Sequence, residues 1–562
     1  MKLRDTETKE KLRGGYYTPP EIARFIVAWG MEGNPQTVLE PSCGDGVFIE
    51  ALDQYGDGLE GAFFHGVEFD SKEAAKAREK FSLLEKRGCS GTGVTKGDFF
   101  EFASRERKRT LKDGVDLIVG NPPYIRYQFF ETGRELAESR LLELGIVTTR
   151  HANSWLYFLA ECVSLMNENS RIGMVIPGEL LDVAYSSDLR RWLTEQLTSI
   201  RIVTFEKLVF PGVQQEIVIF LGEKNANSKE KTVQLIQLED TTQLDVSDFE
   251  QSSMRAPRVI GERDKWTGYF LEKDDFEFYS EIEEGFQGSR FSEKASVDIG
   301  IVTGANNFFC VNDEVVRETR FRSSKKQLQV LPMFSRDTED KGIKFTEEDF
   351  KNNSKNGKKC HMLRFHKDSK KEEMSHNIRS YLLAGEELGL HLRYKCRIRD
   401  PWYWIPSVHS SELCMFKRAS EFTHLIYNEA RAYTTDTIYR IECLENSKEI
   451  GARDLAFSFI NSLTFLSCEL EGRSYGGGVL ELIPSEIERV LLPVYKCSDE
   501  EFSKLDLMLR EGKPIDEILD YTDERILSGN LNNRDMARVR HCWRILQKRR
   551  ENRGRSKRKS TM

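Results

Sequence analysis

The segment Asn121-Pro122-Pro123-Tyr124 directly follows the apolar run 116–120. An amino group on an aromatic ring is a poor nucleophile, because its lone pair is delocalised into the ring. Two acceptors for its N–H bonds, the side-chain oxygen of Asn121 and the carbonyl of Pro122, would favour a pyramidal nitrogen and free that lone pair. Prolines fix such a loop because they lock φ and lack a backbone donor, and the Tyr124 ring can stack on a base. The segment therefore predicts chemistry on a ring amino group, with an ordinary proline-rich turn as the alternative.

Three further loops indicate a nucleotide-like ligand. The segment Glu40-Pro-Ser-Cys-Gly-Asp-Gly46 has two glycines, which let the backbone turn tightly and approach a ligand. Glu68 lies 28 residues after Glu40, about where a nucleotide site places an acid for ribose hydroxyls. Asp98 could accept a bond from an adenine amino group while Phe99 covers the ring face. A structural turn and a helix cap are the alternatives for the glycine segment and the acids.

The elements that must position these loops are predicted strands. Up to about residue 245, short apolar runs alternate with helical patterns, and the helix over Ser71–Lys86 is expected to begin with Ser71 as its cap. This alternation is typical of an α/β fold with a doubly wound, mainly parallel sheet, whose ligands bind beyond the carboxyl ends of the strands. The predicted strands are 37–39, 65–69, 115–119, 172–176, 200–205 and 216–221.

The remainder of the chain has a different pattern. A polar linker covers 225–231, and glycine, aromatic and charged residues then mix up to about 500 without clear alternation. From Asp499 the pattern is helical again. We therefore expect a Rossmann-like α/β domain over 1–245, an α+β domain over 255–500 and a helical segment with a basic tail over 501–562.

Composition and charge narrow the class of protein. No apolar run of the 562 residues approaches the 18 or more that suggest a membrane-spanning helix, and the charged start is not a signal peptide. Eleven cysteines without a CxxC pair indicate reduced thiols inside a cell. The irregular spacing of Cys360, His361, His366 and Cys396 gives no reason to expect a metal.

Two regions are basic although the net charge is −8. Residues 351–400 carry 13 basic and 6 acidic residues, and residues 534–562 carry 12 basic and 2 acidic residues. Such regions can bind phosphates. The hypothesis is that the chain from Arg534 onward is a flexible arm on DNA phosphates, with a solvated loop and a tail without a role as the alternative.

The order of the motifs resembles the gamma-class amino DNA methyltransferases, the N6-adenine enzymes of restriction–modification systems that are similar to the TaqI-type methylase. The resemblance covers roughly residues 14–222. It implies S-adenosyl-L-methionine as the cofactor, double-stranded DNA as the partner, and methyl transfer to N6 of a flipped adenine. The segments that carry it are Gly15-Tyr-Tyr-Thr-Pro-Pro20, Glu40–Gly46, Val67-Glu-Phe-Asp70, Gly97-Asp-Phe99 and Asn121–Tyr124.

The resemblance also assigns site residues. Phe210 is implied to oppose Tyr124 across the flipped base, with a core phenyl as the alternative, and Trp155 and Tyr157 compete with Phe158 for a cofactor contact. The implied catalytic residues are Asn121, Pro122, Tyr124 and Phe210. The implied cofactor contacts are Tyr17, Thr18, Pro19, Glu40, Gly44, Glu68, Asp98, Phe99 and Phe158. Asn307, Arg397 and Arg399 are predicted to read DNA, because Arg and Asn suit bidentate base contacts and lie in segments that resemble target-recognition regions.

The expected enzyme is a C-shaped monomer that holds DNA between a methyltransferase domain and a target-recognition domain. It would act in the cytoplasm of a prokaryotic cell and need no metal. The sequence has no convincing PD…(D/E)xK nuclease core, so any restriction endonuclease would be separately encoded. Three alternatives stay open: an N4-cytosine methyltransferase, an RNA or protein-glutamine methyltransferase, and a catalytically silent DNA-binding subunit.

Overall fold

The chain folds into two compact units in the computed structural model. Unit 1 comprises residues 1–276, 475–477 and 552–562, and unit 2 comprises residues 277–474 and 478–551. The residues that the structure describes are 17–56, 58–125, 129–130, 132–149, 152–207, 209–210, 216–228, 231–246, 258–259, 265–286, 290–321, 327–336, 342–445, 450–475 and 478–555.

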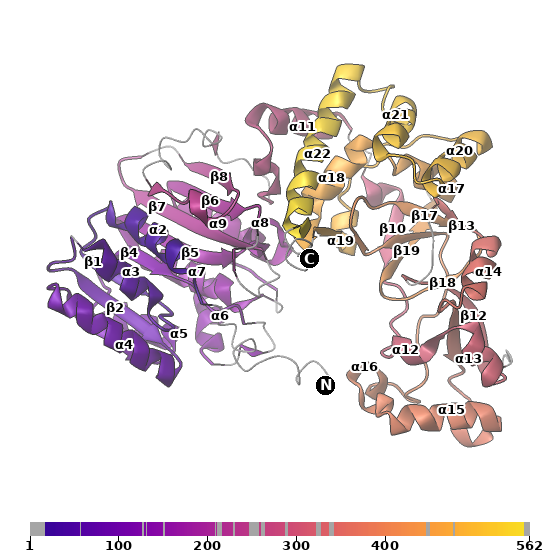
Figure 1. Ribbon diagram of the computed structural model, residues 1–562, viewed down its shortest axis with the longest axis horizontal. Coiled ribbons are helices and arrows are strands. Elements are labelled where there is room, and N and C mark those ends of the chain that lie inside the picture. The colour runs from indigo at the N-terminus through magenta and orange to yellow at the C-terminus, as the bar shows by residue number, and fades with distance from the viewer. Residues whose placement is uncertain are drawn as a thin grey trace. The chain divides into compact units, whose positions relative to one another are not determined.

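Unit 1 is built on a nine-stranded sheet of order β3-β2-β1-β4-β5-β7-β6-β8-β9 (Figure 1). Strand β7 runs antiparallel to its neighbours β5 and β6, and β9 runs antiparallel to β8, whereas the other pairs are parallel. The strands are β1 (Thr37–Glu40), β2 (Phe63–Glu68), β3 (Ser90–Lys96), β4 (Val115–Gly120), β5 (Met166–Pro177), β6 (Ser199–Phe205), β7 (Ile217–Asn225), β8 (Thr232–Leu238) and β9 (Arg258–Val259).

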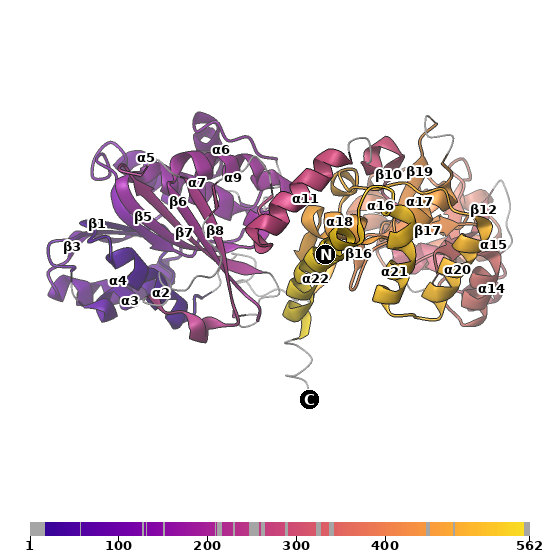
Figure 2. The same ribbon diagram turned by 90° about the horizontal axis from the view of Figure 1, so that it is seen from above.

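Helices cover both faces of this sheet. Figure 2 shows α2, α3 and α4 on one face and α5, α7 and α9 on the other. The central strand β4 is covered from both sides, and its Leu117, Ile118 and Val119 are fully buried. The predicted doubly wound α/β fold is thereby confirmed. The helices are α2 (Pro20–Met31), α3 (Val47–Tyr55), α4 (Ser71–Lys86), α5 (Phe99–Glu106), α6 (Arg134–Glu143), α7 (Ser154–Leu165), α8 (Glu179–Asp182) and α9 (Ser187–Gln196).

Helix α4 has the bounds that the sequence predicts, but its cap is different. The carboxylate of Asp70 accepts hydrogen bonds from the backbone N–H groups of Lys72 and Glu73, at 2.8 and 3.3 Å. The prediction of Ser71 as the cap is therefore wrong, because Asp70 is extended and places its side chain over the first turn. Strand β2 ends at Glu68, so Phe69 lies in the loop between strand and cap.

Unit 2 mixes small sheets with helices, as expected for an α+β region. Its strands form sheets of order β10-β19-β15-β17-β13, β11-β14-β12-β18 and β16-β21-β20. The strands are β10 (Ala295–Asp298), β11 (Cys310–Val311), β12 (Leu328–Phe334), β13 (Lys344–Phe345), β14 (His361–Phe365), β15 (Leu413–Phe416), β16 (Arg418–Ala419), β17 (Leu425–Asn428), β18 (Tyr433–Thr434), β19 (Ile438–Cys443), β20 (Arg473–Tyr475) and β21 (Val479–Glu481).

The helices of unit 2 surround these sheets and fill its carboxyl-terminal part. Helix α11 begins in unit 1 and continues into unit 2. The helices are α11 (Lys273–Gly285), α12 (Asn306–Phe309), α13 (Asp313–Glu318), α14 (Glu347–Lys355), α15 (His376–Glu387), α16 (Tyr394–Arg397), α17 (Ala452–Ser458), α18 (Ser462–Glu471), α19 (Pro484–Ile487), α20 (Asp499–Arg510), α21 (Ile515–Ile526) and α22 (Asn533–Arg555).

Most of the basic carboxyl-terminal segment is packed into unit 2. Arg550 is 1% exposed, and its guanidinium lies 2.8 Å from the carboxylate of buried Glu469 and 3.0 Å from the carbonyl oxygen of Glu421. Arg540 and Arg544 pair with acids of α21. The prediction of a flexible arm from Arg534 is therefore wrong for the helix, because these cations neutralise internal carboxylates. Residues 556–562 lie outside the described residues.

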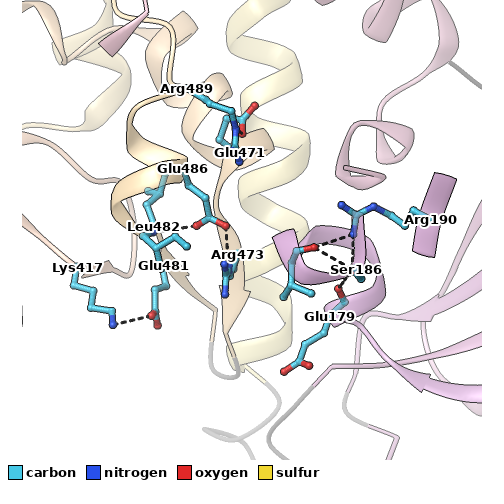
Figure 3. Close-up of polar contacts among 12 residues, drawn as sticks. Glu179, Ser186, Arg190, Lys417, Glu471, Arg473, Glu481, Leu482, Glu486 and Arg489 are labelled. Carbon is cyan, nitrogen blue, oxygen red and sulfur yellow. Dashed lines mark hydrogen bonds and ion pairs between the residues drawn. The ribbon is translucent and has the colours of Figure 1, made fainter. Parts of the chain in front are cut away.

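Other buried charged side chains are also held by hydrogen bonds within each unit. In unit 2, Arg473 bonds the fully buried Glu486 at 2.8 Å (Figure 3). In unit 1, the guanidinium of buried Arg190 donates to the carbonyl oxygens of Leu180 and Val183 and to the hydroxyl of Ser186. These bonds fix the turn between α8 and α9, which follows strand β5.

We expect Arg550→Ala to lower the free energy of unfolding by about 3–5 kcal/mol, because the change leaves the Glu469 charge buried without its partner. Urea denaturation followed by circular dichroism measures this loss. The matched control is Lys548→Ala on the same helix. Lys548 is exposed, so its replacement should change the free energy of unfolding by less than about 0.5 kcal/mol. Equal midpoints for the two variants would contradict the structural role of Arg550.

Candidate active site

The Asn121–Tyr124 loop leaves the sheet where its strand order reverses. Strand β4 pairs with β1, so the loops that follow them lie next to each other at the carboxyl edge. A Cβ atom at Gly120 would lie 3.2 Å from Cδ of Pro41, so glycine allows this close approach. The hydroxyl of Ser42 donates a hydrogen bond to the backbone oxygen of Asn121 at 3.0 Å. The glycine loop after β1 and the Asn121 loop are thus directly joined.

The amide of Asn121 is held from two sides. Its Nδ2 donates to Oγ1 of Thr18 at 3.0 Å, and its Oδ1 accepts from the hydroxyl of Tyr124 at 2.8 Å. The Tyr124 hydroxyl also lies 3.0 Å from the carbonyl oxygen of Val175 on β5. Thr18 and Tyr124 are both buried. These contacts orient the amide, whose oxygen has two lone pairs with which to accept hydrogen bonds.

Ser154, the first residue of α7, clamps the same loop. Its fully buried hydroxyl accepts from the backbone N–H of Ile125 at 2.8 Å and donates to the carbonyl oxygen of Pro123. Its own N–H donates to the carbonyl oxygen of Ile125 at 3.0 Å. The loop therefore has three polar attachments to one residue. Sequence reasoning missed this residue, because only its place at the start of a helix hints at a polar role.

The loop after β1 carries a buried carboxylate. Glu40 is 0% exposed, and no N–H or O–H donor of the described residues reaches its carboxylate oxygens. Burial raises the pKa of Glu40 well above its ordinary value, and the nearby carboxylate of Glu68 adds to that shift. An uncompensated buried carboxylate is costly. A cationic group beside Glu40 would offset the free-energy cost of burying its carboxylate.

Glu68 holds the glycine loop in place. Its Oε2 accepts from the N–H of Gly44 at 2.8 Å, and its Oε1 accepts from the N–H of Asp70 at 2.7 Å. Gly44 has φ +53, and a Cβ atom at this position would meet no other atom within 4 Å, so the loop faces open space there. Burial raises the pKa of Glu68, although the two backbone bonds oppose the shift. The carboxylate retains lone pairs that could accept ribose hydroxyls.

The loop after β3 and the rings near it are more closed than expected. Asp98 caps α5 by accepting from the N–H groups of Phe100 and Glu101, at 2.9 and 3.1 Å. Phe99 and Phe158 are buried and stacked on each other, with ring centroids 5.2 Å apart. The predicted adenine contacts of Asp98, Phe99 and Phe158 stay predictions, and the structure adds a capping role for Asp98 and a packing role for the two rings.

Exposed aromatic side chains lie at the same edge. Tyr17 precedes α2 and is 58% exposed, while Pro19 is the cap of that helix. Phe69, directly after Glu68, is 62% exposed. The sequence did not predict Phe69 as a ligand contact. The signal that could have indicated it is an aromatic residue directly after an acid at the end of a strand.

The remaining predicted residues are dispersed. Phe210 is buried at 4% exposure, and residues 211–215 beside it lie outside the described part of the chain. Arg399 donates to the carbonyl oxygens of Val302 and Thr303, so two of its five N–H donors are used within unit 2. Asn307 accepts from Nζ of Lys359 at 2.8 Å. Arg397 is exposed.

The fold and this edge define a methyltransferase for amino groups: a doubly wound sheet, a glycine loop beside two acids, and an oriented Asn-Pro-Pro-Tyr loop. Residues 3–286, just over half of the chain, match the N-6 DNA methylase family, and the chain belongs to that family. Residues 263–527 match the C-terminal domain of the Type II methyltransferase M.Eco57I. The resemblance seen in the sequence is confirmed, and the protein is a DNA methyltransferase of the restriction–modification type.

Similarity to individual proteins extends over both units. The Type II methyltransferase M.AccI of Acinetobacter calcoaceticus is 24% identical over 525 residues, which cover 91% of this chain and 88% of that protein. The Type IIL restriction-modification enzyme MmeI in complex with DNA superposes with a TM-score of 0.52 at 14% identity, over 94% of this chain and 75% of MmeI. For the DrdV–DNA complex the TM-score is 0.51 at 12% identity, over 89% of this chain and 57% of DrdV. Among the described residues, no helix is long and apolar enough to cross a membrane.

We expect Ser154→Ala to reduce kcat for methyl transfer by about tenfold to a hundredfold, because small displacements of a reacting group are costly. Cofactor affinity, measured by calorimetry, should stay unchanged. The control is Ser164→Ala on the same helix, whose hydroxyl bonds Glu161 and Arg107 instead. A Ser154 variant that loses cofactor affinity but keeps kcat would show that the clamp does not position the loop.

Proposed function

We propose that the protein transfers a methyl group from S-adenosyl-L-methionine to N6 of an adenine that is flipped out of duplex DNA. The observation that carries the proposal is the orientation of the Asn121 amide by Thr18 and Tyr124. Membership of the N-6 DNA methylase family supports the adenine product. Transfer to N4 of cytosine is the second candidate, because the same two acceptors suit either amino group.

The base side of the reaction depends on acceptors that are fixed before the substrate arrives. Nδ2 of Asn121 is bonded to Thr18, so the amide cannot rotate freely, and Oδ1 is directed to the side of Tyr124. Together with the carbonyl of Pro122, Oδ1 would accept the two N–H bonds of the target amino group. Preorganised acceptors stabilise the developing positive charge without reorganisation during the reaction.

The residues on the cofactor side of the site suit a ligand that carries positive charge and a nucleoside. S-adenosyl-L-methionine supplies a methyl group on a positively charged sulfur. Glu40 would face its cationic amino acid part, Gly44 would allow close approach, and Glu68 would accept the ribose hydroxyls. Tyr17, Thr18 and Pro19 would complete this side of the site. We assign Phe69 as a candidate for stacking on the adenine ring, because it is exposed beside Glu68.

Base extrusion would use Tyr124 and Phe210. Removing a base from the stack costs a few kcal/mol, and stacking on an aromatic side chain returns about 1–3 kcal/mol per ring. Tyr124 is held by its hydroxyl, so its ring is already in place. The expected partners are duplex DNA in a prokaryotic cytoplasm and a separately encoded endonuclease, with the methyltransferase acting as a monomer.

The product test is mass spectrometry of nucleosides from DNA treated with the protein and labelled cofactor. We expect N6-methyladenine, and Asn121→Ala should lower its rate of formation by about a hundredfold or more, since an acceptor of the transition state is lost. Cofactor affinity of the variant should stay close to that of the wild type. N4-methylcytosine as the sole product would contradict the adenine assignment and show that the target base is cytosine.

A second test addresses the adenine ring of the cofactor. Phe69→Ala should weaken cofactor binding by about tenfold, in keeping with about 1–3 kcal/mol for one stacked ring. Tyr55→Ala is the matched control, because Tyr55 is 42% exposed and ends α3 at the opposite edge of the sheet. Calorimetry with S-adenosyl-L-homocysteine measures both. Equal affinities would leave Phe99 and Phe158 as the candidates.

A further inference from the structure

Unit 2 leaves an unusual set of apolar side chains uncovered. Among its described residues seven large hydrophobic side chains are exposed, and five of them lie between 383 and 398. They belong to α15, the turn after it and α16, which lie at the end of unit 2 away from α21 (Figure 1). The five are Leu383 at 43% exposure, Leu388 at 74%, Leu392 at 65%, Tyr394 at 64% and Ile398 at 60%.

The segment 388–398, which we call the α16 surface, is firmly anchored beneath these side chains. Leu390 and Cys396 are buried at 5% and 0% exposure. Arg399 ties the end of the segment to the backbone of the 302–303 loop, at 2.7 and 2.8 Å. A Cβ atom at Gly304 would lie 3.0 Å from Cβ of Lys395, so that loop packs closely against α16. The α16 surface is therefore preorganised, which lowers the ordering cost of binding.

The same surface is positively charged. Arg393, Lys395 and Arg397 alternate with the apolar residues and are all exposed. No ion pair joins any of the three to an acid of the described residues, and the sequence has no Asp or Glu from 388 to 399. Cations elsewhere in unit 2 are often neutralised, as Arg510 is by Asp349 at 2.7 Å. The charge of the α16 surface is thus complementary to a polyanion.

We propose that the α16 surface docks into a groove of the duplex DNA substrate. Arg393, Lys395 and Arg397 contact phosphates, and Leu392 and Tyr394 press against sugars and base edges. Proteins that bind in a groove of DNA combine cations, which contact phosphates, with protruding apolar side chains, which partly unstack neighbouring base pairs. The inference rests on the proposed function only in taking duplex DNA as the partner.

The charge test uses the triple variant Arg393→Ala, Lys395→Ala, Arg397→Ala in the full-length protein. The slope of log affinity against log salt for a duplex should flatten by about 0.9 for each lost phosphate contact. The control removes the same charge through Lys355→Ala, Lys496→Ala and Lys548→Ala, three exposed lysines of unit 2. Its slope should stay close to that of the wild type.

The apolar test uses Leu392→Ala with Tyr394→Ala. Binding of duplex DNA should weaken by about tenfold, in keeping with the loss of one stacked or wedged ring. The salt slope should not change, because no cation is removed. Leu507→Ala, at an exposed leucine on α20, is the control for lost apolar surface. Thermal unfolding of each variant establishes that the fold is intact.

The outcomes separate this inference from the proposed function. Variants of the α16 surface that bind duplex DNA as their controls do would overturn the inference. Loss of self-association in sedimentation, with DNA binding intact, would also overturn it and assign the surface to a second copy of the chain. A wild type that binds duplex DNA without methylating it would refute the proposed function, while the comparison of variants would still decide the role of the α16 surface.

Discussion

The pairing of β1 with β4 is the constraint on which the candidate site depends. It brings together the glycine loop, which would approach the cofactor, and the Asn121 loop, which would present an amide to the target base. The hydrogen bond from Ser42 to the backbone of Asn121 joins the two loops directly. Thr18 from the amino-terminal segment and Ser154 from α7 add attachments from other parts of unit 1. A transfer between two bound molecules requires such joining, because the groups that hold them must lie within about 0.5 Å of the productive geometry.

The two acids near the glycine loop have different environments and therefore different uses. Glu68 accepts two backbone N–H bonds, which shape the loop and support its ionised form. Glu40 is completely buried beside it and is not stabilised by such donors among the described residues. The loop thus contains one acid that organises the backbone and one whose charge would be stabilised by a bound cation. This division favours a positively charged ligand over a neutral nucleotide.

The sequence predicted the elements well, and the contacts less well. The alternation of apolar runs located β1, β2 and β4, which carry three of the site loops, but did not predict β3, which precedes Asp98. The bounds of α4 were predicted because its pattern has neither Gly nor Pro. Its cap was assigned one residue too late, since both Asp70 and Ser71 suit that position. The partners of Asn121 were beyond the sequence, because Thr18 lies 103 residues away and the bond depends on the packing of α2. Periodicity reports which face of an element is buried, not which polar atoms meet across it.

The basic regions also show that the sequence predicts charged side chains better than it predicts their partners. A count of basic residues predicted a free arm from Arg534, yet Arg540, Arg544 and Arg550 face acids of unit 2. Arg397 and Arg399 are two residues apart and were given one role, but one is exposed and the other bonds the backbone of a neighbouring loop. Only cations without an internal acid are available to phosphates at low cost, since a paired cation must first lose its partner. The availability of a cation to DNA is therefore decided by burial and pairing, and on α16 the exposed cations Lys395 and Arg397 lie beside exposed apolar side chains.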